Sequence, residues 1–148
     1  MNKNKVILTY YDAEENIAEE TLWIEVLDNN EYQIKNIPFF APNIAYNDII
    51  KVENDEGILY FDEIIKTSEH STIQVVFFKT EIIEDVIKEI ESLGCSWEGM
   101  NNQKLLAIDI PSNVNFNKIK EYLNDQFEKN VLDYKESCLS ETHSQQMN

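Results

Sequence analysis

The pair His70-Ser71 is the first place in this sequence where chemistry could be expected. A histidine can act as a general base or as a hydrogen-bonding group near neutral pH. The pair lies in a polar stretch, residues 67–71, between two differently patterned halves of the chain. Pockets often form at such boundaries, so we expect a pocket here that also involves Phe39, Phe40 and Tyr46. The alternative is a histidine that only caps or bridges the two halves.

Other catalytic and metal-binding patterns do not occur in the sequence. A metal site needs clustered donors, whereas the candidate donors here are far apart along the chain: His70, Cys95, Cys138 and His143. The chain has only three glycines and neither a dinucleotide-binding fingerprint nor a P-loop. We therefore expect no metal, no cofactor and no enzymatic activity. A Cys95–His70 nucleophile pair is possible in principle, but no local pattern supports it.

The two cysteines are forty-three residues apart, and we expect both to be small buried hydrophobic residues without a disulfide.

The net charge of −16 is the strongest feature of the composition. The chain has 28 acidic residues, 12 lysines and no arginine, and the acidic excess extends over both halves. Nucleic-acid binding is disfavoured, because cationic side chains must neutralise the phosphates. A strong negative field instead favours fast capture of a basic protein. The alternative is that the charge only maintains solubility.

Two groups of acidic residues are candidates for the surface that contacts such a partner. A partner-binding surface is expected at Glu14, Glu15, Glu19, Glu20, Asp55 and Glu56. Ordinary solvated loops are the alternative for both groups.

No apolar run approaches the roughly 20 residues of a membrane span. The short apolar stretch after the N-terminal lysines does not have the pattern of a signal peptide. These features predict a cytoplasmic protein that does not interact with membranes.

The first half of the chain has the pattern of five short strands. Alternating apolar residues occur at 5–11, 21–27, 31–35, 48–53 and 58–66, with a polar connection at 12–20. Turn residues at 28–30 and 54–57 predict two hairpins. The pattern is typical of a strongly bent antiparallel sheet or a small SH3-like β-barrel.

The segment 37–48 interrupts this pattern with two prolines, three aromatic residues and four aliphatic ones. Proline excludes a helix interior or a central strand. We expect an irregular connection that packs into the core, at the joint between the two halves. Phe39 and Phe40 could alternatively be exposed anchors for a partner.

The second half alternates strands with helices. Strands are expected at 72–79, 95–98, 104–110 and 131–138, with a turn at 99–102. One helix is expected at 80–93, with Thr80 as its N-cap. A second helix is expected to begin after an N-cap at Asn113 or Asn115. The order β-α-β-β-α-β predicts a ferredoxin-like (split βαβ) unit and an α+β fold overall. Val76 and Phe78 would lie on its open sheet face, where we expect the barrel to cover them.

These patterns divide the chain into a strand-rich lobe (1–71), an α+β lobe (72–138) and a disordered, polar tail (139–148).

Several motifs resemble one bacterial protein family. They are Tyr32-x-Ile34-x-Asn36-Ile37-Pro38-Phe39-Phe40-Ala41-Pro42-x-Ile44-Ala45-x-x-Asp48, then His70-Ser71-Thr72, Leu93-Gly94-Cys95 and the stretch from Leu105 to Pro111. In this order they resemble domain-of-unknown-function family 4265, which often has glycine at the positions of Asn43 and Asn47. The resemblance implies a two-part α+β body and brings no established catalytic residues. Small acidic bacterial proteins of this kind are also similar in type to immunity proteins that neutralise toxins.

Two hypotheses follow. The first is a non-enzymatic binding protein, most concretely an immunity-type inhibitor that holds a basic toxin by charge complementarity. The second is a small-molecule-binding or catalytic domain, with a pocket between the two lobes that includes His70.

Overall fold

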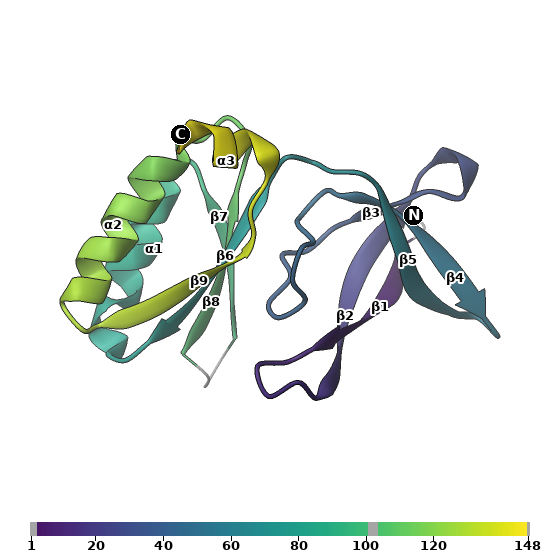
Figure 1. Cartoon of the computed structure of the whole chain (residues 1–148), viewed down its shortest axis with the longest axis horizontal. Coiled ribbons are helices and arrows are strands. Elements are labelled where there is room, and N and C mark those ends of the chain that lie inside the picture. Colours follow the sequence, from purple (N-terminus) through teal and green to yellow (C-terminus); the bar gives the residue numbers. More distant parts are fainter. Residues whose placement is uncertain (1–2, 101–103, 148) are drawn as a thin grey trace.

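Two units lie side by side along the long axis of the molecule, a barrel and an α/β layer (Figure 1). The computed structural model describes residues 3–100 and 104–147. Strands β1 (Lys3–Tyr11), β2 (Ile17–Val26), β3 (Tyr32–Ile34), β4 (Ile49–Asp55) and β5 (Ile58–Lys66) form a closed barrel, with a short 3-10 helix, η1 (Asp28–Asn30), before β3. Neighbouring strands are antiparallel, except where β5 closes the barrel against β1 in parallel.

Alternating side chains fill the barrel. The inward positions are aliphatic and buried, and the core consists of Val6, Leu8, Leu22, Ile24, Ile34, Ala41, Ile44 and Ile50. The β4–β5 turn forms as expected, because Glu56 and Gly57 both have positive φ and the Gly57 N–H donates to the Asn54 side chain at 2.8 Å. The β1–β2 connection is shorter than predicted, since β2 already begins at Ile17.

The segment 37–48 is an irregular connection packed into the core, as its prolines predicted. Ile37, Ala41, Ile44 and Ala45 are buried. Asn43 and Asn47 have φ of 63° and 70°, the left-handed conformation that glycine adopts freely and asparagine tolerates. Asparagine at these two positions therefore fits the backbone.

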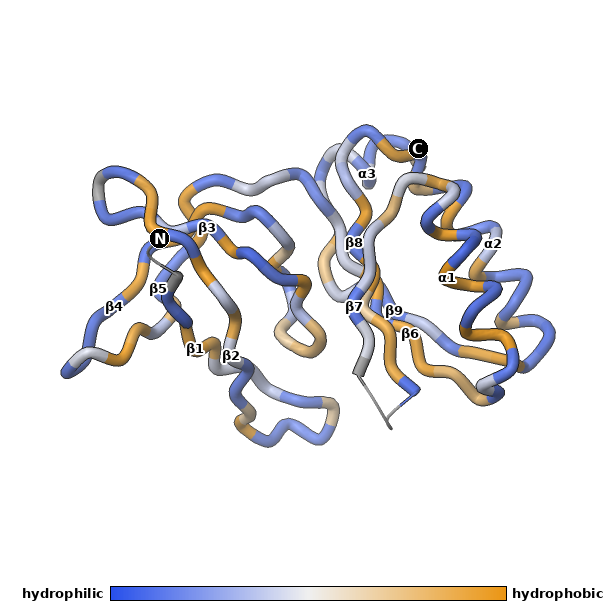
Figure 2. The backbone as a smooth tube through the Cα atoms, turned by 180° about the vertical axis from the view of Figure 1, so that it is seen from behind, coloured by the Kyte–Doolittle hydropathy of each residue, from blue (hydrophilic) through white to orange (hydrophobic). Residues whose placement is uncertain are grey.

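The second unit is a four-stranded antiparallel sheet with two long helices on one face (Figure 1). Its elements are β6 (Ser71–Phe77), η2 (Thr80–Ile82), α1 (Ile83–Ser92), β7 (Ser96–Met100), β8 (Leu105–Ile110), α2 (Phe116–Glu128) and β9 (Leu132–Cys138). The strand order is β7-β8-β6-β9. Figure 2 shows hydrophobic stretches alternating with hydrophilic ones along α1 and α2, as expected for helices that bury one side. No described helix combines the length and the apolar character needed to cross a membrane.

Local details of the second unit differ from the sequence prediction. Asn115 caps α2 by accepting the Asn117 N–H, but Thr80 caps no helix because it is the first residue of η2. Strand β7 continues to Met100, while Asn101 and Asn102 of the predicted turn lie outside the described residues. The barrel covers the open sheet face only in part, because Gln74 is buried but Val76 and Phe78 remain 40% and 54% exposed.

The prediction of a disordered C-terminal tail is wrong for residues 139–147. They contain helix α3 (Glu141–Gln146), whose first turn is capped by Ser140. The ring of His143 is fully buried and stacks on Phe116 with the centroids 5.1 Å apart. Its Nε2 is 2.9 Å from the Pro111 carbonyl and its Nδ1 is 2.6 Å from the Ser71 hydroxyl.

These two partners fit a neutral His143. The Pro111 carbonyl can only accept, so Nε2 carries the proton and Nδ1 accepts from the Ser71 hydroxyl. Burial lowers the pKa of His143 below its ordinary value of 6.5. The folded state therefore takes up this proton less readily than the unfolded state does.

We predict that His143→Asn lowers stability at pH 7.5 and that the deficit relative to wild type shrinks towards pH 5. Wild type loses the contribution of neutral His143 as the pH falls through the unfolded pKa towards the lower folded pKa, whereas the variant has no imidazole to protonate. Urea unfolding of both proteins at several pH values measures this difference. All other ionisable groups are shared, so a deficit that stays constant or grows on acidification would contradict the assignment.

Candidate functional site

The joint between the two units is organised around the carboxylate of Glu20. Its oxygens accept the backbone N–H groups of Phe39 and Ala41, both at 2.7 Å, and of Phe40 at 3.0 Å. Glu20 lies opposite Leu8 on β1 and shares the inward side of β2 with Leu22 and Ile24. Its side chain therefore reaches the irregular segment, which has no strand partner for these N–H groups.

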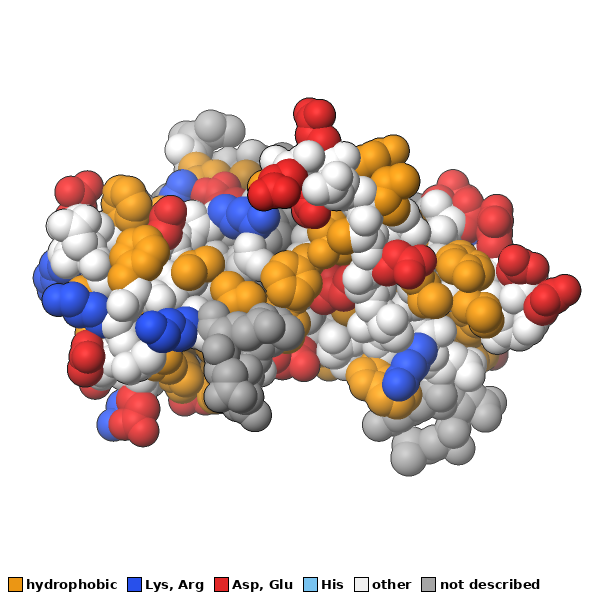
Figure 3. All heavy atoms as spheres, turned by 90° about the horizontal axis from the view of Figure 1, so that it is seen from below, with side chains coloured by type: hydrophobic (Ala, Val, Ile, Leu, Met, Phe, Trp, Pro, Cys, Tyr) orange, Lys and Arg blue, Asp and Glu red, His pale blue; other side chains and the backbone are white. Residues whose placement is uncertain are grey.

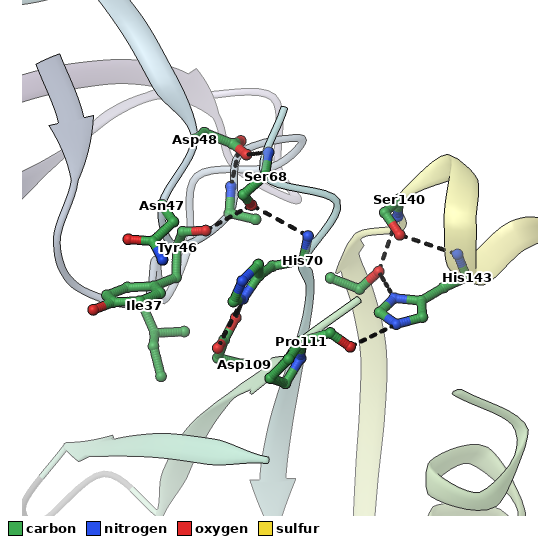
Figure 4. Close-up of polar contacts among 12 residues, drawn as sticks. Ile37, Tyr46, Asn47, Asp48, Ser68, His70, Asp109, Pro111, Ser140 and His143 are labelled. Carbon is green, nitrogen blue, oxygen red and sulfur yellow. Dashed lines mark hydrogen bonds and ion pairs between the residues drawn. The ribbon is translucent and has the colours of Figure 1, made fainter. Parts of the chain in front are cut away.

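Asp48 likewise accepts backbone N–H groups at the other end of this segment. Its two oxygens accept the N–H of Ala45 at 2.9 Å and the N–H of Ser68 at 2.8 Å (Figure 4). The side chain is buried and burial raises the pKa of Asp48, although both N–H groups favour the charged form. Asp48 thereby ties the segment to the linker that enters β6.

Three further hydrogen bonds cross directly between the units. The Gln74 side chain donates to the Phe39 carbonyl at 2.8 Å, and the Asn43 N–H donates to the Ser137 carbonyl at 2.9 Å. The Ile37 N–H donates to the Glu98 carboxylate, and burial raises the pKa of Glu98. Because these bonds come from β6, β7 and β9, the segment rests on the sheet face opposite the helices.

His70 lies at this joint and is held by a carboxylate. Its Nδ1 is 2.8 Å and 3.0 Å from the two oxygens of Asp109, which is buried on β8 (Figure 4). The ring lies 5.9 Å from that of Tyr46. Among the described residues, Nε2 has no hydrogen-bond partner. A carboxylate behind the other ring nitrogen is the arrangement that orients a histidine towards a ligand or a reacting group.

Two hollows open at the joint, and His70 lines both. One, of about 290 Å³, also involves Gln33, Asn47 and Lys66. The other, of about 250 Å³, also involves Asp48, Glu69 and Cys138. Each volume is near or below the lower end of the range for small-molecule sites.

The expected pocket residues are brought to the joint only in part. His70 lines the hollows, and Tyr46 contacts it. Phe39 and Phe40 are partly buried neighbours with centroids 6.1 Å apart, and neither they nor Tyr46 line either of these two hollows. Ser71 is fully buried behind His70, where it binds His143 and the Ser140 N–H. A serine in that position holds α3 and is not accessible to a substrate.

Sequence reasoning missed the carboxylates of this joint. Asp109 could have been found, because it lies out of phase with Leu106, Ile108 and Ile110 and must face away from the helices. Alternation along the strand also distinguishes Glu20 from Glu19, because Glu20 lies on the same side of the strand as the apolar Leu22 and Glu19 lies on the other side. No pattern in the sequence indicated which N–H groups would donate hydrogen bonds to Asp48.

Nucleophilic chemistry is not favoured at this joint. Cys138 and His70 line the same hollow, but burial raises the pKa of Cys138 to about 12, with Asp48 and Glu69 adding to the rise. Burial likewise raises the pKa of Cys95 to about 12. The thiolate is the reactive form, so neither thiol is activated. Within residues 3–100 and 104–147, no cluster of three or more His, Cys, Asp or Glu side chains could hold a metal ion.

The acidic residues expected to bind a partner divide into two kinds. Glu14, Glu15 and Glu19 are exposed on or beside the β1–β2 connection, whereas Glu20 is engaged at the joint. Asp55 and Glu56 are exposed at the β4–β5 turn, far from the β1–β2 connection in Figure 1.

Lysine neutralises few of the carboxylates. In the described part of the chain, lysine forms ion pairs only from Lys51 to Glu63 at 3.9 Å and from Lys120 to Glu136 at 2.6 Å. On the face that Figure 3 shows, acidic side chains lie over both units and most of the visible lysines lie over the second.

Comparisons with known proteins find similarity to a protein family and to a solved structure. The family model described as domain of unknown function DUF4265 matches residues 20–134. A crystal structure of a hypothetical protein from Neisseria gonorrhoeae is 35% identical, with a TM-score of 0.86, and the match covers 95% of this chain and 97% of that chain. No curated protein matches the sequence significantly.

We predict that Glu20→Gln lowers the free energy of unfolding by about 1–3 kcal/mol, because one amide oxygen cannot replace a carboxylate that accepts three N–H groups. Glu19→Gln removes the same charge from an exposed side chain one residue away. This control variant should change the free energy of unfolding by less than about 0.5 kcal/mol. Urea denaturation measures both. Equal stabilities of the two variants would show that Glu20 does not hold the joint.

Proposed function

We propose that this chain, which belongs to the DUF4265 family, is a non-enzymatic protein that binds a basic partner protein. The most concrete form of the proposal is an immunity protein that neutralises a basic bacterial toxin. One observation carries it. A net charge of −16 remains on a folded chain in which only two lysine–carboxylate pairs form among the described residues.

The carboxylates fall into two groups, those engaged at the joint and those exposed to solvent, and this supports the proposal. Glu20, Asp48, Glu98 and Asp109 are occupied at the joint by backbone N–H groups or by His70. The exposed acids at the two hairpin connections contribute little to the fold, so they remain available to a partner. Negative potential on an exterior of this kind accelerates encounter with a basic protein.

The hydrogen bonds across the joint support a binding role as well. Hydrogen bonds link the irregular segment to β6, β7 and β9, two through the side chains of Gln74 and Glu98 and one between backbone groups, so the two units form one body that presents a fixed surface. A preorganised surface loses less conformational entropy on binding.

We also infer that the architecture combines an SH3-like barrel with a ferredoxin-like unit. The closed five-stranded barrel supports the first assignment. The order β-α-β-β-α-β, with β6 and β8 central in the sheet, supports the second.

One observation favours a second candidate function, a small-molecule site at the joint. The His70–Asp109 pair leaves Nε2 beside two hollows. A metabolite that raises the melting temperature of wild type but not of His70→Ala would establish it. The first function takes precedence because the adjacent thiol of Cys138 is not activated and the hollows are small.

The experiment measures association with the proteins encoded beside the gene of this chain, and we expect the partner among them to be basic. Stopped-flow rates should fall by at least about tenfold as ionic strength rises from about 0.01 M to about 1 M, since the Debye length shrinks from about 30 Å to about 3 Å. Partners that are only neutral or acidic, or a rate that does not depend on salt, would contradict the proposal.

A matched pair of variants tests whether the exposed hairpin acids matter. Glu14→Gln/Glu15→Gln/Glu19→Gln should lower the association rate and weaken its salt dependence. Glu84→Gln/Asp85→Asn/Glu89→Gln changes the net charge equally on exposed positions of α1, which packs on the sheet face opposite the barrel, and should lower the rate less.

A further inference from the structure

The outward face of the β1–β2 hairpin carries large apolar side chains that the barrel does not bury. Cross-strand pairing places Tyr11 opposite Ile17 and Lys5 opposite Trp23. Tyr11 and Ile17 are 71% and 69% exposed, and Trp23 is 46% exposed. The inward alternation of both strands already fills the barrel core, so these outward side chains are not needed for the fold.

A hollow of about 480 Å³ lies at the Trp23 end of this face. Trp23, Ile7 and the half-exposed Ile58 line it, together with the start of β1. The Lys5 ammonium lies 4.5 Å from the centre of the Trp23 ring, so the indole is partly covered by a side chain that can move away. The hollow is wide enough for an aromatic or long aliphatic side chain.

Acidic residues lie at both ends of this face. Glu14 and Glu15 are beside Tyr11 and Ile17, and Glu19 lies opposite Thr9 on the same outward face. Asp55 and Glu56 immediately precede Gly57, which lines the hollow. The nine residues of β1 span roughly 30 Å between these ends. Apolar side chains near both ends of a face, each with carboxylates close by, are complementary to an apolar anchor flanked by cationic side chains.

The hairpin connection is preorganised. The Asp12 carboxylate accepts the N–H groups of Glu14 and Asn16, both at 2.9 Å, and Glu15 adopts a left-handed φ of 64°. Figure 1 shows this connection projecting from the barrel. Little conformational entropy is therefore lost when a partner contacts it.

We propose that this face of β1 and β2, completed by Ile58, is the docking surface for the basic partner. The segment of the partner that occupies it carries an aromatic or aliphatic anchor between lysine or arginine side chains. The anchor fills the hollow at Trp23, and Tyr11 and Ile17 make the second apolar contact. This inference rests on the proposed function and adds the surface and the chemistry of the bound segment.

The test uses the full chain with Trp97→Phe, which leaves Trp23 as its single tryptophan, and random peptides displayed on phage as the probe. We expect selected peptides to combine Lys or Arg with an apolar residue and to shift the Trp23 emission to shorter wavelength. Tyr11→Ser/Ile17→Ser should weaken their binding by at least about tenfold. Val76→Ser/Phe78→Ser alters exposed apolar residues on the sheet of the other unit and should leave the affinity unchanged.

The outcomes separate this inference from the proposed function. Basic peptides that bind with no change in Trp23 emission, and equally well after Tyr11→Ser/Ile17→Ser, would overturn the docking surface and leave the function intact. Selection of neutral or acidic peptides would overturn both. The melting temperature of each variant is measured first, so that a loss of binding is not mistaken for unfolding.

Discussion

Hydrogen bonds that backbone N–H groups donate to side-chain carboxylates hold the joint on which the rest of this molecule depends. The segment 37–48 contains prolines and left-handed residues, so it cannot join a strand ladder. Buried N–H groups without partners would each cost about 1–3 kcal/mol. Glu20 and Asp48 together accept four N–H groups of this segment and the N–H of Ser68 in the linker, and the segment becomes the layer between the barrel and the sheet.

The same interaction explains how an acidic chain folds with few ion pairs. Carboxylates at the joint exchange water for oriented N–H groups or for His70, which offsets part of the cost of their burial without lysine. The remaining acids stay in water, where mutual repulsion is screened by salt. An excess of negative charge is therefore compatible with the fold and remains available for recognition. The raised pKa of both thiols leaves neither cysteine activated as a nucleophile.

Local patterns predicted most of the elements, whereas contacts between distant residues decided the site. The strands and both long helices follow from periodicity, and the irregular 37–48 segment follows from its prolines. Helix α3 had no such signal, because the polar sequence around His143 is ordered by Ser71 and Pro111, which are distant in sequence. Glu20 and Glu19 look alike in composition but differ in phase along β2, and this phase separates a structural residue from a surface one. The incomplete cover over Val76 and Phe78 depends on how the units meet, which alternation alone does not determine.

Amide hydrogen exchange at Phe39, Phe40, Ala41, Ala45 and Ser68 tests the central claim most directly. These five N–H groups belong to irregular backbone, yet each donates to a carboxylate. We expect these N–H groups to be protected as strongly as those of the barrel strands, and to lose protection together when the protein unfolds globally. Exchange as fast as that of the exposed β1–β2 connection would show that the joint opens independently, and the fixed two-unit body would have to be abandoned.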